Sequence, residues 1–230
     1  MSSHIGKSDP ALGRKVHEHL VSVGLETPTV AEKLHVDNEV KIASIEQSMR
    51  SVLEVLGLDL TDDSLIETPK RVAKMFVKEL FWGLDYDHFP KCTAIDNKMN
   101  YNDSFVLEKG VTVHSSCEHH LVTIDGFATV AYIPHKKVLG LSKLNRIVQY
   151  FAKRPQVQER LTEQIAETIA LIAETPDVAV YIDAKHYCVK SRGIQDVSSS
   201  TVTLASRGRF TSDSDIRREF LNLARMQPQQ

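Results

Sequence analysis

The sequence is poor in cysteine and has no long apolar run. Its 230 residues include three cysteines, at positions 92, 117 and 188. An odd number argues against a disulfide framework and for reduced thiols. No apolar stretch reaches the roughly 20 residues of a transmembrane helix, and the N-terminus lacks the apolar core of a secretory signal. We therefore predict a cytoplasmic protein with no membrane partner.

The chain also lacks the charge excess that is typical of nucleic-acid-binding proteins. Its 28 basic and 30 acidic residues give a net charge of −2, so no overall basic field is expected and we predict no nucleic-acid partner. It contains neither of the two common glycine-rich phosphate loops and no internal repeat. An anionic ligand would therefore have to be bound by a local basic cluster.

Composition and patterning predict a folded α+β protein. Hydrophobic residues make up 42% of the chain and charged residues 25%, close to globular averages. Residues 1–38 are polar and mixed, and we expect an N-terminal arm that lies on a partner. We expect residues 39–230 to form one α+β domain, with a helical part at 39–95 and a strand-rich part at 96–230.

The patterns also predict individual elements. An apolar stripe beginning at Ile42 predicts one helix, and Thr68-Pro69 predicts the start of the next, with Thr68 as N-cap. Asp125-Gly126 predicts a type I′ hairpin between two strands. The remaining strands are expected at Ser104–Glu108, Val111–Ser116, His120–Ile124, Phe127–Ile133, Val178–Val189 and Val197–Ala205, and the remaining helices at Gly140–Ala152, Gln156–Glu174 and Asp213–Met226.

The segment Cys117-Glu118-His119-His120 is the strongest chemical signal in the chain. It offers a thiol, a carboxylate and two imidazoles within four residues, between two predicted strands. The Cys-x-x-His spacing allows Cys117 and His120 to bind one metal ion. A buried cysteine and a hydrogen-bonded core histidine would explain the same residues without a metal.

A second cluster, His186-Tyr187-Cys188, favours the metal. On a strand, His186 and Cys188 would point to the same face because side chains alternate with a period of two. Cys117, His120 and Cys188 would then form a three-ligand zinc site with one position open to water, the arrangement of catalytic zinc. His119 and His186 would remain for proton transfer, although spacing alone leaves open which histidine ligates.

Basic residues next to these clusters indicate an anionic substrate. Lys143 and Arg146 lie three positions apart on a predicted helical turn, and Lys190 and Arg192 follow the second cluster. Glu159 is a candidate for binding the N–H groups of a cyclic ligand. The helix dipole alone also explains a glutamate in the first turn of a helix.

Four motifs together resemble the zinc-dependent type of GTP cyclohydrolase I. The resemblance runs from about residue 40 to the end, and only the N-terminal arm lacks a counterpart. The motifs are Cys117–His120, Gly140–Val148, Arg154–Thr162 and His186–Gly193.

The resemblance implies a fold, an activity and an assembly. The fold is the tunnelling fold, an antiparallel sheet with helices on one side, here preceded by an N-terminal helical part. The activity converts GTP and water to 7,8-dihydroneopterin triphosphate and formate, the first step of folate and pterin synthesis. The assembly is a homodecamer of two pentamers, with one zinc ion per subunit and active sites at subunit boundaries.

The resemblance also implies residue roles. The zinc ligands are Cys117, His120 and Cys188, and Glu118 supports the site without ligating. The catalytic residues are His119, His186 and Ser142, with Ser142 near the ribose-triphosphate end. The substrate-binding residues are Glu159 at the guanine edge and, for the triphosphate, Lys143, Arg146, Arg192 and Arg71, the last from a neighbouring subunit.

Other functions fit the sequence less well. A non-catalytic, zinc-stabilised binding module would use the same metal with a fourth protein ligand. A relative acting on pterins or deazaguanines through a nucleophilic thiol would need neither the Cys-x-x-His nor the His-x-Cys pair. A zinc nucleoside deaminase is disfavoured because His-x-Glu and Pro-Cys-x-x-Cys are both missing.

Overall fold

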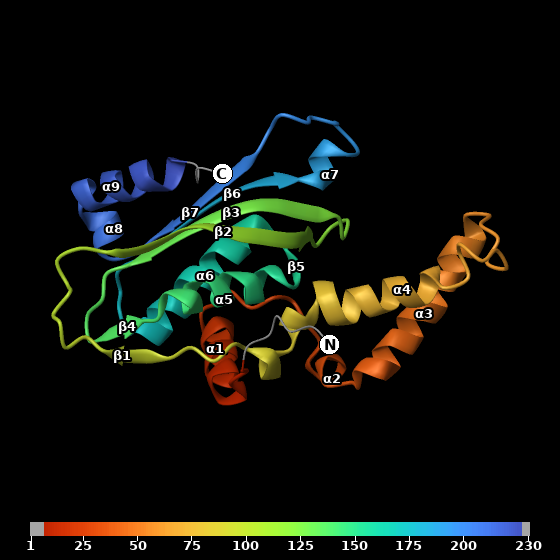
Figure 1. The fold of residues 1–230 in the computed structure, drawn as a ribbon, viewed down its shortest axis with the longest axis horizontal. Helices are drawn as coiled ribbons and strands as arrows, with labels where there is room; N and C mark the ends of the chain where they lie inside the picture. Colours follow the sequence, from red (N-terminus) through yellow and green to blue (C-terminus); the bar gives the residue numbers. More distant parts are fainter. Residues whose placement is uncertain (1–6, 227–230) are drawn as a thin grey trace.

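The computed structural model describes residues 7–226, which form a sheet with helices and a projecting helical hairpin (Figure 1). The α-helices are α1 (Pro10–Ser22), α2 (Ala31–Leu34), α3 (Asn38–Val55), α4 (Thr68–Met75), α5 (Leu141–Ala152), α6 (Gln158–Ala173), α7 (Tyr187–Lys190), α8 (Arg209–Ser212) and α9 (Ser214–Arg225). The strands are β1 (Ala94–Asp96), β2 (Val106–Cys117), β3 (Thr123–Tyr132), β4 (Lys137–Leu139), β5 (Pro155–Gln156), β6 (Val178–His186) and β7 (Thr201–Ser206). No helix in this part of the chain is long and apolar enough to cross a membrane.

The main sheet has the strand order β5-β2-β3-β6-β7. All its pairings are antiparallel except the short parallel pairing of β2 with β5. The amphipathic helices α5 and α6 bury their apolar stripes against one face, where residues such as Ile147 and Ile165 are fully buried. On the other face, α8 and α9 cover one end of the sheet through Phe210 and Phe220. The predicted α+β fold is confirmed, with this second helical cover as an addition.

The predicted hairpin at Asp125-Gly126 is wrong. Both residues lie inside β3, where Gly126 pairs with Ala184 of β6. A Cβ on Gly126 would lie 2.2 Å from the carbonyl oxygen of Asp183, so glycine is needed here for close strand approach and not for a turn. The two strands predicted at 104–108 and 111–116 are one strand, β2, interrupted by a register shift between Glu108 and Val111.

The N-terminal segment packs on its own chain. Val16 and Leu20 of α1 are fully buried in the same core as α5 and α6, so α1 belongs to the core of its own chain, whereas its polar composition suggested an arm that lies on a partner. The division of the chain at residue 38 stays a prediction.

Helices α3 and α4 project from the rest of the molecule as a hairpin (Figure 1). The stripe of α3 is largely exposed, and Ile42 is its one buried residue. Helix α4 begins at Thr68 as predicted, with Pro69 in its first turn, but its N-cap is Glu67. Beyond Met75 the helix widens into a π-helical turn at Phe76–Leu80.

A fully buried arginine joins the N-terminal segment to the sheet. Arg154 is 0% exposed, and its Nη1 lies 3.4 Å from Glu26 Oε1 and 3.3 Å from the hydroxyl of Tyr86. Its Nη2 donates to the carbonyl oxygen of Gly83. The guanidinium also lies about 5 Å from three aromatic ring centroids. Burial raises the pKa of Tyr86, although the charge of Arg154 opposes this shift.

Replacing this arginine will strongly destabilise the protein. Arg154→Met leaves the Glu26 carboxylate, 14% exposed in the folded chain, without its buried cation. We expect the free energy of unfolding to fall by about 3–5 kcal/mol, measured by urea denaturation. The matched control is Arg218→Met, because Arg218 pairs with Asp215 at the surface and is 68% exposed. The control should cost less than about 1 kcal/mol, and equal losses in the two variants would contradict a structural role for Arg154.

Candidate metal centre

The turn between β2 and β3 holds the first cluster. Cys117 ends β2 and is 4% exposed, with its backbone N–H donating to Val122 O at 2.8 Å and its carbonyl accepting from Leu121 N at 2.8 Å. Leu121 has a φ of 53°, the left-handed conformation that lets the chain reverse here. The cluster therefore forms the hairpin turn itself, not an interruption in a strand before a later hairpin.

The second cluster lies where β6 ends. His186 is the last residue of β6, and Cys188 lies in the short helix α7. The prediction that His186 and Cys188 share one face of a strand is therefore wrong. The helical turn brings Cys188 to the same centre by another route, because β6 is the neighbour of β3 in the sheet and Ile124 pairs with His186.

The three predicted ligands come together. The ligand atoms of Cys117, His120 and Cys188 lie within 4.8 Å of one another, a spacing at which all three can bind one ion. Two thiols and an imidazole are the soft and borderline donors that zinc prefers. Burial and the neighbouring thiol of Cys117 raise the pKa of Cys188, so metal binding must displace the proton of that thiol.

The two histidines of the turn differ in their contacts. Their ring centroids are 6.3 Å apart, with 69° between the ring planes. His119 Nδ1 lies 3.8 Å from Cys117 Sγ, and its side chain is exposed. Arg192 Nη1 donates to His120 Nε2 at 2.9 Å, so a cation lies directly beside the candidate metal centre.

Glu118 is held away from the ligand set by a salt bridge. Its carboxylate accepts from Arg160 Nη1 at 2.7 Å and from Nη2 at 3.4 Å. Its backbone N–H donates to Gln156 O at 3.0 Å. These contacts fix the turn against α6, the supporting role that was expected for Glu118.

His186 is close to the centre and bonded to a buried amide. Its Nε2 lies 2.7 Å from Gln158 Oε1. Partial burial lowers the pKa of His186, while the charge of Glu159 acts in the opposite direction. Glu159 itself is exposed in the first turn of α6. The expected guanine-binding carboxylate thus lies beside an expected proton-transfer group.

The remaining predicted site residues, Ser142, Lys143, Arg146 and Arg71, lie apart from the Cys117 centre. Ser142, Lys143 and Arg146 are in the first turns of α5, which follow β4 at the end of the sheet opposite to α7 (Figure 1). Burial raises the pKa of Cys92 to about 12, against the lowering effect of the nearby Lys143 and Arg146 charges. Arg71 is exposed on α4. Within residues 7–226, no hydrogen bond or ion pair joins these four polar residues to the Cys117 centre.

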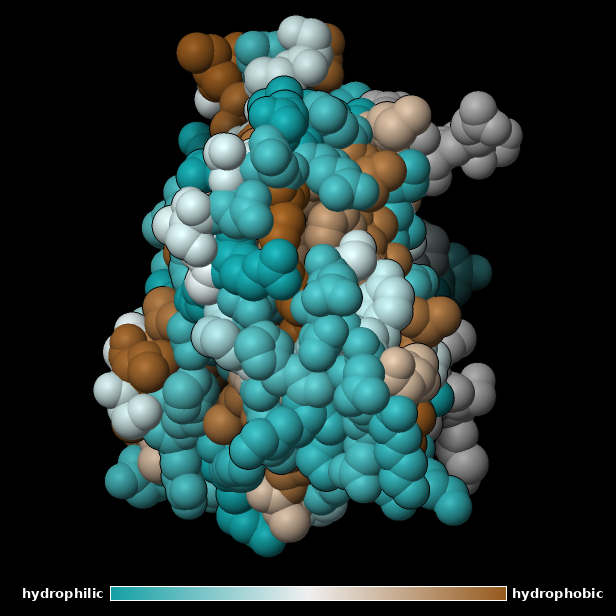
Figure 2. All heavy atoms as spheres, turned by 90° about the vertical axis from the view of Figure 1, so that its left-hand side faces the viewer, coloured by the Kyte–Doolittle hydropathy of each residue, from teal (hydrophilic) through white to brown (hydrophobic). Residues whose placement is uncertain are grey.

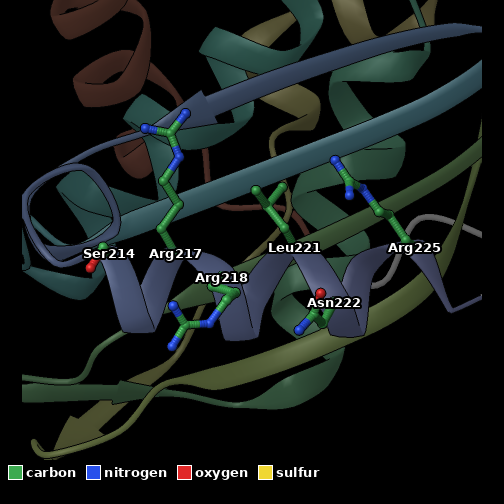
Figure 3. A pocket seen from close by; sticks show the side chains of 6 residues that line it. All are labelled: Ser214, Arg217, Arg218, Leu221, Asn222 and Arg225. Carbon is green, nitrogen blue, oxygen red and sulfur yellow. The ribbon is translucent and has the colours of Figure 1, made fainter.

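A shallow hollow on α9 lies away from all of these residues. Its volume is about 230 Å³, and Figure 3 shows Arg217, Leu221 and Arg225 on one side of the helix and Arg218 on another. Seen from the end that carries α8, the surface is mainly hydrophilic with scattered apolar patches (Figure 2). We assign no chemistry to this hollow.

Comparisons with known proteins identify the family. A family model described as GTP cyclohydrolase I matches residues 45–225. The chain belongs to the GTP cyclohydrolase I family. Its similarity to a Haemophilus ducreyi GTP cyclohydrolase 1 is 57% identity over 210 residues, covering 91% of this chain and 95% of that protein. A Shewanella amazonensis GTP cyclohydrolase 1 is 56% identical over 212 residues, covering 92% and 97%.

Solved structures with partial similarity include the apo form of an archaeosine synthase QueF-like protein, with a TM-score of 0.39 and 19% identity, covering 46% of this chain and 96% of that one. The resemblance inferred from the four motifs of the GTP cyclohydrolase I family is confirmed by the family match.

Three buried or paired residues of the site were missed in the sequence. Arg160 holds Glu118, Gln158 contacts His186, and Arg154 anchors the strand beside Cys117. All three lie in the motif Arg154–Thr162, and membership of that motif is the sequence signal that they share. The partners of Gln158 and Arg160 are 28 or more positions away along the chain, so sequence spacing could not reveal these contacts.

Replacing one thiol of the centre should abolish metal binding. We expect Cys188→Ala to lose its bound ion, because two remaining donors hold zinc far less tightly than three. His119→Ala should keep the ion, because His119 is not one of the three residues whose donor atoms all lie within 4.8 Å of one another. Metal analysis of the purified variants by mass spectrometry tests both expectations, and retention of metal by Cys188→Ala would overturn the ligand assignment.

Proposed function

We propose that this protein uses a zinc ion at Cys117, His120 and Cys188 to open the guanine imidazole ring of GTP. Water attacks C8, which leaves as formate, and the remaining atoms rearrange to 7,8-dihydroneopterin triphosphate. The observation that carries the proposal is a three-donor set with two non-ligand histidines, His119 and His186, beside it. The family match supports the same activity.

Zinc and the protein side chains have separate roles in the proposed reaction. When bound, zinc supplies the Lewis acidity that makes water a sufficient nucleophile at neutral pH. His119, exposed beside Cys117, donates a proton to the ring nitrogen that is released when the imidazole ring opens. His186 is the second proton-transfer group. Glu159 accepts hydrogen bonds from the guanine edge, and Arg192 contributes positive charge close to the reacting centre.

The triphosphate is bound by residues of a neighbouring subunit. Lys143, Arg146 and Ser142 lie at the opposite end of the sheet from α7 in one chain (Figure 1). A second chain that places its α5 beside this metal centre would complete the site, and Arg71 on the projecting α4 would reach in from another. We propose the homodecamer of two pentamers that the family resemblance implies, acting in the cytoplasm.

The activity has a direct assay. Zinc-loaded protein incubated with GTP should release formate and give a fluorescent pterin after oxidation, and a chelator should stop both. His119→Ala should lower kcat by about 10²–10⁴-fold, the usual contribution of a general acid or base. Failure of the zinc-loaded wild type to release formate would overturn the proposed function.

A non-catalytic zinc-binding module is the main alternative. It would require a fourth protein ligand, for which His119 and His186 are the nearest candidates. The absorption spectrum of cobalt-substituted protein distinguishes the two cases, because an open position responds to added anions and a closed four-ligand site does not. Within residues 7–226, the group of donors that lie within 4.8 Å of one another contains neither His119 nor His186, which favours the open position.

The shared site predicts complementation between inactive variants. Lys143→Ala and Cys188→Ala damage opposite ends of the chain, so a mixed oligomer contains some sites in which both residues are intact. Co-expressed, differently tagged copies purified over both tags should therefore recover turnover that neither variant has alone.

The control pairs Cys188→Ala with His119→Ala. These two residues lie at the same end of the chain, so each site takes both from one subunit and the mixture should stay as inactive as its components. Recovery in the control, or none in the Lys143 mixture, would contradict the proposed sharing.

A further inference from the structure

Gln158 is a buried amide with a complete set of hydrogen-bond partners. It lies at the start of α6, is 1% exposed, and faces β6 and β7. Its Nε2 lies 2.9 Å from Thr201 O, 3.0 Å from Thr203 Oγ1 and 3.3 Å from Ile182 O. Its Oε1 lies 2.7 Å from His186 Nε2.

These partners fix the orientation of the amide. The carbonyl oxygens of Thr201 and Ile182 can only accept hydrogen bonds, so the amide nitrogen must face them. The amide oxygen therefore faces His186, and it too can only accept. It follows that His186 Nε2 carries a hydrogen, and that Nδ1 is the nitrogen with the free lone pair in the neutral ring.

Two threonines make this orientation self-consistent. Thr162 Oγ1 donates to Gln158 O at 2.7 Å and lies 2.7 Å from Thr203 Oγ1. Because the hydroxyl hydrogen of Thr162 is used, Thr203 donates to Thr162. The Thr203 oxygen is then free to accept from Gln158 Nε2, and each donor in this network of hydrogen bonds has an acceptor. Flipping the amide would oppose oxygen to oxygen at Thr201 and Ile182.

We propose that Gln158 is a positioning residue that holds His186 in the tautomer with hydrogen on Nε2. This leaves the lone pair of Nδ1 free to accept a proton and fixes the plane of the imidazole ring before substrate binds. The role rests on the proposed function, in which His186 transfers a proton during opening of the guanine ring. Gln158 does not touch the reacting atoms, so it acts only through His186.

Nitrogen NMR measures the tautomer directly. Full-length protein labelled with ¹⁵N-histidine should show the Nε2–H form at His186, assigned by comparison with His186→Asn. Gln158→Met has a similar shape but no acceptor, and it should give a mixture of tautomers. Gln158→Glu keeps an acceptor facing the ring and should retain the Nε2–H form.

Kinetics supply the second measurement. Gln158→Met should lower kcat about 10–100-fold, the usual loss when a residue that orients an active-site group is removed, with little change in KM. Gln158→Glu should recover part of that loss. The matched control is Asn97→Leu, just after β1. Asn97 is also buried and its amide also donates to a backbone carbonyl, that of His135, but it makes no hydrogen bond to His186.

The outcomes separate the positioning role from its alternatives. An unchanged tautomer in Gln158→Met, or the same tautomer shift and loss of kcat in Asn97→Leu, would overturn the proposal in favour of a purely structural role. A tautomer shift in Gln158→Met, together with an unchanged tautomer in Asn97→Leu, supports it. Because the NMR experiment needs no turnover, a wild type that fails to act on GTP would refute the proposed function while the tautomer result still stands.

Discussion

The geometry of the candidate metal centre depends on a charge that is fully removed from water. Arg154 is enclosed by Glu26, Tyr86 and the carbonyl of Gly83, so its long side chain cannot move without uncompensated burial of charge. The residue after it starts β5, whose two residues pair with Ser116 and Cys117. The anchor for one candidate metal ligand is thus an ion pair made with the N-terminal segment.

A second buried network continues from this anchor to the turn. Gln156 donates to Gln164 Oε1 at 2.8 Å, and Gln164 donates to Leu25 O at 2.8 Å. The carbonyl of Gln156 accepts from Glu118 N. The amide chain therefore connects residues 25–27, helix α6 and the Cys117–His120 turn. This gives the N-terminal segment a role in shaping the site, although it carries none of the proposed catalytic residues.

The sequence allowed better prediction of which residues are candidate metal ligands than of the secondary-structure elements that carry them. The Cys-x-x-His spacing showed that Cys117 and His120 could reach one ion, but spacing left open whether His119 or His120 is the ligand, and the choice of His120 came from the family resemblance. Gly126 was misassigned to a turn because a glycine needed for close strand packing has the same appearance in a sequence as one needed for a positive φ. Cys188 was correctly grouped with Cys117 but for an incorrect reason, since a helical turn and not a strand directs it.

The separation of Lys143 and Arg146 from the candidate metal centre is the structural basis for proposing a site shared between subunits. Strand β3 runs for 10 residues, about 33 Å at roughly 3.3 Å per residue. Its first residue follows the turn that holds His120, and its last, Tyr132, accepts a hydrogen bond from Leu139 N at 2.8 Å, just before α5. Lys143 and Arg146 lie in the first turns of the helix that follows, and no hydrogen bond or ion pair among residues 7–226 joins them to the Cys117 turn. The proposed sharing would place the α5 of a second subunit at this turn, so that both ends of one GTP molecule enter the same site.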